Sequence, residues 1–181
     1  MIKCCPDGGI GRRAGFKIQF WQQSVGSIPT LGTEDIMTRN KQKRYDSAYM
    51  KMALEWAKLS HCERKKVGAL IVKDNMIISD GYNGTPSGFE NICEMESGET
   101  KWHVLHAEAN AILKCAKHGQ SCQGADLYLT LSPCKDCSKL IHQAGIKRII
   151  YYKAYKDNTG LEFLQQAGVK ITHLDDLKNY E

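Results

Sequence analysis

The sequence has no long apolar run. None of its hydrophobic stretches approaches the roughly 20 residues that a transmembrane helix needs, and the N-terminus lacks the continuous apolar segment of a secretory signal peptide. We therefore expect no membrane association and a cytoplasmic location. Because disulfides are uncommon in that reducing compartment, the eight cysteines are interpreted as metal ligands or buried thiols.

A concentrated basic stripe is also missing. The chain carries a formal net charge of +5, but its lysines and arginines are spread along the sequence. Nucleic-acid-binding proteins usually gather such residues on one face or along one helix. The nearest approach is the segment 39–44, which we interpret as a solvated stretch ahead of a helix. Nucleic acid is therefore not expected as a partner.

Residues 1–36 differ from the rest of the chain. They are rich in glycine and show no persistent helical or strand period, which is typical of a disordered extension. A second hypothesis is that the segment is not native protein. Residues 25–29, Val-Gly-Ser-Ile-Pro, can be encoded by codons containing GGTTCGATTCC, which resembles the T-arm of a tRNA gene. Translation would then start at Met37, and residues 37–181 would form one domain.

Hydrophobic periodicity in residues 37–181 predicts alternating helices and strands. Two β-rich runs around Asp74-Asn75 predict a hairpin. The patterns predict helices over 45–59, 106–117, 133–143 and 159–167, and strands over 67–72, 76–79, 126–131, 147–152 and 169–172. This order predicts an α/β fold of three layers, α/β/α, in which helices cover both faces of one mixed five-stranded sheet.

Three residues of the kind that bind zinc stand at two predicted helix starts. His106 opens one helix, while Cys134 and Cys137 lie three residues apart in the first turn of another, so that both thiols project to one side. The positive end of that helix favours thiolates. Three protein ligands are typical of a catalytic zinc whose fourth position is open to water, whereas a structural zinc is usually closed by four. Cys115 is the alternative fourth ligand for a structural site.

Glu108 follows His106 by two residues and is not needed as a ligand. A zinc ion lowers the pKa of its bound water toward about 7. A carboxylate beside the ligands is placed to take that proton and to deliver it to a ring nitrogen and a leaving amine. The pattern H-x-E followed by P-C-x-x-C is the signature of zinc-dependent base deaminases, and Glu108 is the predicted catalytic residue.

From about residue 44 to residue 173 the sequence resembles the deoxycytidylate (dCMP) deaminases of the zinc-dependent cytidine/deoxycytidylate deaminase superfamily. The resemblance rests on the segments 106–112 and 132–137 and on the loop Gly-Tyr-Asn-Gly-Thr-Pro-Ser-Gly over 81–88. It implies a cytidine-deaminase-like fold, conversion of dCMP to dUMP for thymidylate synthesis, and a hexamer. It also implies activation by dCTP and inhibition by dTTP, with Mg²⁺ accompanying the regulatory nucleotide. Residues 37–181 would be the catalytic domain.

The same resemblance implies that Asn83 hydrogen-bonds the substrate, and Tyr155 is a candidate for lining the nucleotide pocket. No residue is identified as the partner of the 5′-phosphate. Arg64, Lys65 and Lys66 are the nearest basic group, but each could be a solvated loop charge.

A second, structural zinc is present in some members of the family. Here Cys62 and Cys93 flank the predicted hairpin, with His61 and His103 available. Two interpretations are therefore open. Either a second zinc is held by Cys62, Cys93 and His103, or these cysteines are buried thiols.

Other functions share parts of the pattern. A tRNA adenosine deaminase has the same zinc motif, but it needs an open basic groove, and the segment 89–102 carries four glutamates that would repel phosphates. A deaminase of cytidine or riboflavin intermediates needs no phosphate site. A catalytically silent zinc scaffold would have no use for Glu108.

Overall fold

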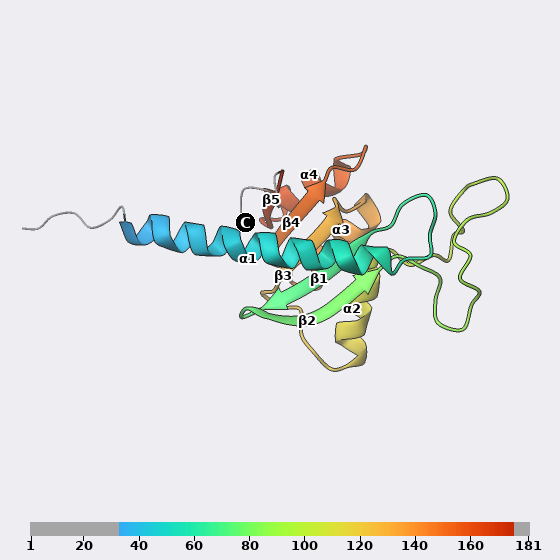
Figure 1. The fold of residues 1–181 in the computed structure, drawn as a ribbon, viewed down its shortest axis with the longest axis horizontal. Coiled ribbons are helices and arrows are strands. Elements are labelled where there is room, and N and C mark those ends of the chain that lie inside the picture. Colours follow the sequence, from blue (N-terminus) through green and yellow to red (C-terminus); the bar gives the residue numbers. More distant parts are fainter. Residues whose placement is uncertain (1–32, 176–181) are drawn as a thin grey trace, which may run out of the picture.

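The computed structural model describes residues 33–175, which contain four helices and five strands (Figure 1). Residues 1–32 and 176–181 lie outside the described residues, so nearly all of the segment predicted to be disordered or non-native lies outside them. The expected boundary between residues 36 and 37 falls inside the first helix, α1 (Thr33–Lys58).

One mixed sheet of five strands forms the centre of the molecule, as predicted. Its order is β2 (Met76–Tyr82), β1 (Gly68–Lys73), β3 (Asp126–Leu131), β4 (Arg148–Lys153) and β5 (Lys170–His173). Strand β1 is antiparallel to both of its neighbours, whereas β3, β4 and β5 run parallel. The hairpin between β1 and β2 is closed by Asp74 and Asn75, whose φ angles of 51° and 61° suit a tight primed turn.

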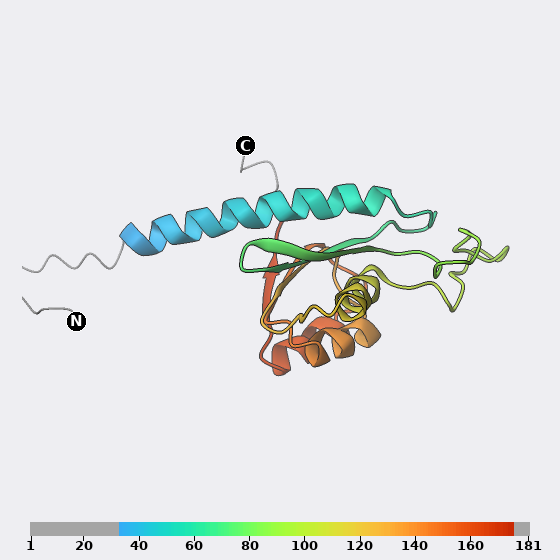
Figure 2. The ribbon, with the colours of Figure 1, turned by 90° about the horizontal axis from the view of Figure 1, so that it is seen from below.

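Helices cover both faces of the sheet, which confirms the three-layer prediction. Figure 2 shows α1 alone on one side, with α2 (Ala107–Lys117), α3 (Lys135–Gln143) and α4 (Thr159–Gln166) on the other. Alternate residues of β1 point to opposite faces. Leu70 packs in the core under α1, and Ile71 packs in the core formed with α2 and α3. No helix within residues 33–175 combines the length and the apolar character needed to cross a membrane.

Helix α1 begins at Thr33, well before the predicted start at Tyr45. The segment 33–44 contains neither glycine nor proline, so nothing in it stops a helix that the buried half has nucleated. Residues 37–44 are exposed, which confirms that 39–44 is solvated. The helical state of these residues escaped prediction because they have no apolar face to reveal a period.

A buried ionic network fixes α1 to the sheet. The Asp46 carboxylate accepts hydrogen bonds from Arg148 Nη1 and Nη2 at 2.9 and 2.8 Å, and from the Tyr128 hydroxyl at 2.7 Å. Arg148 also donates to Asp126 at 2.8 Å. Helix α1 is therefore joined to β3 and β4 by charged groups as well as by apolar packing. Nothing in the local sequence patterns pointed to this network.

Candidate metal centre and active site

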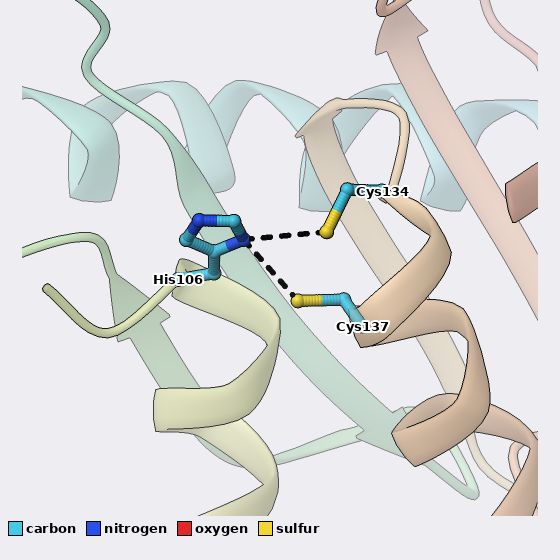
Figure 3. Close-up of side chains that lie close together, drawn as sticks. All are labelled: His106, Cys134 and Cys137. Carbon is cyan, nitrogen blue, oxygen red and sulfur yellow. Dashed lines mark hydrogen bonds between the residues drawn. The ribbon is translucent and has the colours of Figure 1, made fainter. Parts of the chain in front are cut away.

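The three predicted zinc ligands meet on one side of the sheet. His106 immediately precedes α2, and Cys134 immediately precedes α3, whose first turn carries Cys137. His106 Nδ1 lies 3.5 Å from Cys134 Sγ and 3.4 Å from Cys137 Sγ (Figure 3). All three ligand atoms lie within 4.8 Å of one another, the one such group of histidine, cysteine or acidic residues in the described part of the chain.

These distances fit a zinc ion. Zinc bonds of about 2.3 Å to sulfur and about 2.05 Å to nitrogen, at tetrahedral angles, place the two donor atoms about 3.6 Å apart. The observed nitrogen–sulfur separations of 3.4 and 3.5 Å are close to this calculated distance. Cys115 does not join the group and instead contacts Cys122. Within residues 33–175 the site thus has three protein ligands, as expected for a catalytic rather than a structural zinc.

The two thiols differ in their readiness to ionise. Hydrogen bonds from Cys137 and then His106 lower the pKa of Cys134 to about 3, so this sulfur is a thiolate. The hydrogen bond to Cys134 and burial raise the pKa of Cys137, which keeps its proton. The Cys134 thiolate also raises the pKa of His106. Binding of a metal must therefore displace the proton of Cys137, and the raised pKa of His106 strengthens the competition from protons at that ligand.

Glu108 lies in the first turn of α2 and is 4% exposed. Burial raises its pKa to about 7, against the opposing influence of the neighbouring His106. A carboxyl group with such a pKa can both take up and release a proton at neutral pH. Glu108 is not among the three ligands, and its catalytic role stays a prediction.

A cavity of about 170 Å³ opens beside these groups. His106, Glu108 and Cys134 line it from the metal side. Its other walls come from the loop before β1, the residues that follow β2, β3 and β4, and the segment 89–105. They include Cys62, Arg64, Lys65, Asn83, Glu94, Thr100, Val104, Ser132 and Tyr155. The segment 89–102 therefore lies beside the site and forms part of the cavity wall.

Asn83 lines the cavity and also holds part of its wall. Its Oδ1 accepts a hydrogen bond from the Val67 amide, and its Nδ2 donates to the Lys65 carbonyl, both at 2.8 Å. An amide side chain has two acceptor sites on oxygen and two N–H groups. One of each is left for a ligand, so the predicted contact with substrate is stereochemically open and stays a prediction.

Tyr155 and Lys65 stand together in the cavity wall. The Tyr155 amide donates to Ser132 Oγ at 2.7 Å, and Lys65 Nζ lies 4.6 Å from the centre of the Tyr155 ring. Arg64 is tied to the segment 89–105, with its amide donating to Glu94 and its guanidinium to Thr100 at 3.2 and 3.3 Å. Sequence patterns gave no sign of these contacts, because the segment that provides Glu94 and Thr100 is irregular.

The predicted second zinc site is not assembled. Cys62 and Cys93 are joined in a disulfide, which leaves neither thiol for a metal, and the His103 ring packs against Phe89 and Trp102 instead. The expectation that the cysteines are reduced is wrong for this pair. The segment 89–105 folds back on the loop before β1, which brings the two Cα atoms within 5.1 Å and buries both side chains with Val104.

Comparison with known proteins places these features in one family. The model of the cytidine and deoxycytidylate deaminase zinc-binding region matches residues 43–153. Deoxycytidylate deaminase of Enterobacteria phage T4 is 34% identical over 168 residues, which cover 69% of this chain and 87% of the relative. Deoxycytidylate deaminase of Mycobacterium phage D29 is 38% identical over 123 residues, covering 60% and 94%.

A solved structure agrees with the match in sequence. The dCMP deaminase of cyanophage S-TIM5, in complex with dCMP and dUMP, superimposes with a TM-score of 0.69 and is 49% identical, covering 70% of this chain and 94% of that chain. The matched family region contains both halves of the zinc motif and the cavity residues between them. The chain belongs to the zinc-dependent cytidine and deoxycytidylate deaminase family.

Proposed function

We propose that this protein hydrolyses dCMP to dUMP and ammonia, with zinc held by His106, Cys134 and Cys137. The observation that carries the proposal is Glu108, a buried carboxyl beside three zinc ligands and at the wall of a cavity, but outside the ligand set. Similar proteins are dCMP deaminases, and one of them was crystallised with dCMP and dUMP.

Glu108 is the proton carrier in this reaction. Zinc, when bound, supplies the Lewis acid that makes water acidic at neutral pH. Glu108 accepts a proton from the attacking water and passes it to the pyrimidine nitrogen beside the amine-bearing carbon. The oxygen adds to that carbon, and the bond to the amine then breaks. The amine leaves as ammonia after it receives, through the same carboxyl, the proton of the added hydroxyl, whose oxygen becomes the carbonyl oxygen of the product. A pKa near 7 suits a group that both accepts and donates.

The substrate would be held by the opposite wall of the cavity. Asn83 has one acceptor site and one N–H free for the nucleoside, and Tyr155 offers its ring. Lys65 is the proposed partner of the 5′-phosphate. Its ammonium lines the cavity and has no carboxylate partner among residues 33–175, whereas Arg64 is already engaged by Thr100. A phosphate would give Lys65 the counter-charge that it lacks.

Replacement of Glu108 by glutamine tests the role of this residue. We expect Glu108→Gln to retain zinc and dCMP binding but to lose about four orders of magnitude in turnover, because proton transfer is typically worth about two to four orders and one carboxyl serves several transfers. Glu94→Gln is the matched control, since Glu94 lines the same cavity away from the ligands. Turnover of dCMP by Glu108→Gln within tenfold of the parent would contradict the role, and loss of zinc would make Glu108 a ligand.

Relative rates on four substrates test the substrate assignment. Ammonia release should be fastest with dCMP, slower with deoxycytidine and cytidine, and absent with a tRNA anticodon stem, because Glu94 in the cavity wall and the other glutamates of the segment 89–102 would repel an extended phosphate chain. Equal rates on dCMP and deoxycytidine would contradict the proposal that the protein recognises the 5′-phosphate.

The family resemblance extends the proposal to assembly and regulation. A hexamer, activation by dCTP with Mg²⁺ and inhibition by dTTP are expected, and light scattering together with turnover in the presence of each nucleotide tests them. A second zinc per chain requires the Cys62–Cys93 disulfide to open, so zinc content should exceed one ion per chain only under reducing conditions.

A further inference from the structure

Two glycines allow the ligand-bearing segments to approach their neighbours very closely. A Cβ atom on Gly81 in β2 would lie 2.3 Å from the Ala107 carbonyl oxygen and 2.8 Å from the Ala111 nitrogen, both in the backbone of α2. Real Cβ atoms essentially never come within 3.0 Å of such atoms. Gly81 has no positive φ, so the lack of space alone requires glycine here.

Gly160 holds the other half of the site in the same way. It lies in the first turn of α4, and a Cβ there would be 2.6 Å from the Pro133 carbonyl oxygen and 2.9 Å from the Cys134 carbonyl carbon. The Ser138 hydroxyl, itself bonded to the Cys134 carbonyl, would also be 2.6 Å away. The backbone of a zinc ligand is therefore in direct contact with this glycine.

The overlap that a methyl group would cause at either glycine is large compared with the variation that zinc–ligand distances tolerate. Ordinary contact begins at 3.4 Å, so a methyl group would need about 1.1 Å of extra space at the Ala107 carbonyl oxygen, about 0.8 Å at the Pro133 carbonyl oxygen and about 0.5 Å at the Cys134 carbonyl carbon. Ala107 directly follows His106. Zinc–ligand distances tolerate only about 0.2 Å.

We propose that Gly81 and Gly160 are positioning residues that set the separation between His106 and Cys134. One glycine sets how close the start of α2 lies to the sheet, and the other sets how close the start of α3 lies to α4. The spacing of the ligands is the result of both. This inference rests on the zinc site proposed above.

Gly68 provides a matched control in the same sheet. A Cβ on Gly68 in β1 would lie 2.1 Å from the Ala53 carbonyl oxygen and 2.8 Å from the Ala57 nitrogen, both in the backbone of α1. The crowding is at least as severe as at Gly81, but it acts on the opposite face of the sheet, against a helix that carries no ligand. If zinc affinity fell only because the fold is less stable, Gly68→Ala and Gly81→Ala should lose zinc affinity to the same extent.

The experiment compares Gly81→Ala, Gly160→Ala and Gly68→Ala. Zinc affinity is measured by competition with a chelator, the visible spectrum of the Co²⁺-substituted protein reports ligand geometry, and thermal unfolding of the metal-free protein reports stability. We expect Gly81→Ala and Gly160→Ala to weaken zinc binding by about 10- to 100-fold, the range for changes that reorient metal ligands, and to alter the Co²⁺ spectrum. Gly68→Ala should lose comparable stability while keeping the parent's zinc affinity and Co²⁺ spectrum.

Three results would overturn the proposal: parental zinc affinity in both site variants, an equal loss of affinity in Gly68→Ala, or failure of both site variants to fold. The last would show that the glycines serve the fold as a whole. If only one of the two site variants folds, its zinc affinity and Co²⁺ spectrum decide whether the proposal holds. Comparison of the parent with Cys134→Ser tests the zinc site separately. Full zinc binding by Cys134→Ser would contradict the proposed zinc site, whereas the glycine variants test only the role of the glycines.

Discussion

Replacing Asp46 by alanine should destabilise the protein strongly without changing a residue of the active site. Asp46 and Arg148 are 5% and 8% exposed, and removal of one member of a buried ion pair costs about 3–5 kcal/mol. Because Arg148 keeps its 2.8 Å bond to Asp126, the lower end applies, about 3 kcal/mol. The Tyr128 hydroxyl loses its acceptor, which adds about 1 kcal/mol.

The total of about 4 kcal/mol corresponds to a fall in melting temperature of roughly 12–16 °C for a domain of this size. Thermal unfolding of zinc-saturated protein, followed by circular dichroism, measures it. The control is Glu55→Ala on the same helix, which breaks a 2.6 Å ion pair with Lys58 whose side chains are 66% and 69% exposed. Exposed pairs contribute at most about 1 kcal/mol. If Asp46→Ala lost no more than Glu55→Ala, the buried network would contribute no net stability.

Four further outcomes are expected. Cys134→Ser should lose most of its zinc and its activity, and full metal occupancy by mass spectrometry would contradict its role as a ligand. A protein that starts at Met37 should be fully active with an unchanged melting temperature, whereas a large drop would show that residues 1–36 pack. Lys65→Met should raise KM for dCMP by about 10- to 100-fold, as for loss of a charged hydrogen bond, but leave KM for deoxycytidine unchanged, and an equal effect on both would exclude a phosphate contact. Zinc affinity should fall as pH is lowered, because protons compete with the metal for Cys137 and for His106, whose pKa values are both raised; chelator competition at several pH values measures this, and a flat profile would contradict proton displacement from the ligands.

Elements with a local signal were predictable from the sequence. The hairpin followed from Asp74-Asn75 between two β-rich runs, α2 followed from its alanine content, and α3 and α4 followed from proline or glycine at their ends. The end of β2 was missed because Gly81 is typical of a strand break, although here it extends the strand to Tyr82 beneath α2. Residues 37–44 of α1 were missed because an exposed helical segment carries no apolar period.

The zinc ligands were predictable because each stands at a helix start within a compact motif. Other features depend on contacts between distant segments. Asp46 and Arg148 are 102 residues apart, and Cys62 meets Cys93 only because an irregular segment folds back on the loop before β1. No local pattern encodes such pairs, so sequence reasoning could offer Cys62 and Cys93 as metal ligands or thiols but not as a disulfide.

The separation of His106 and Cys134 by 28 residues links metal binding to the folding equilibrium. The two residues meet only when α2 and α3 are docked on the sheet, so the unfolded chain has no preformed site for both. A ligand that binds only the folded state adds RT ln(1 + [L]/Kd) to stability, about 1.4 kcal/mol for each tenfold excess over Kd. The fraction of molecules that are folded thus rises with free zinc, and the melting temperature becomes a measure of the metal supply.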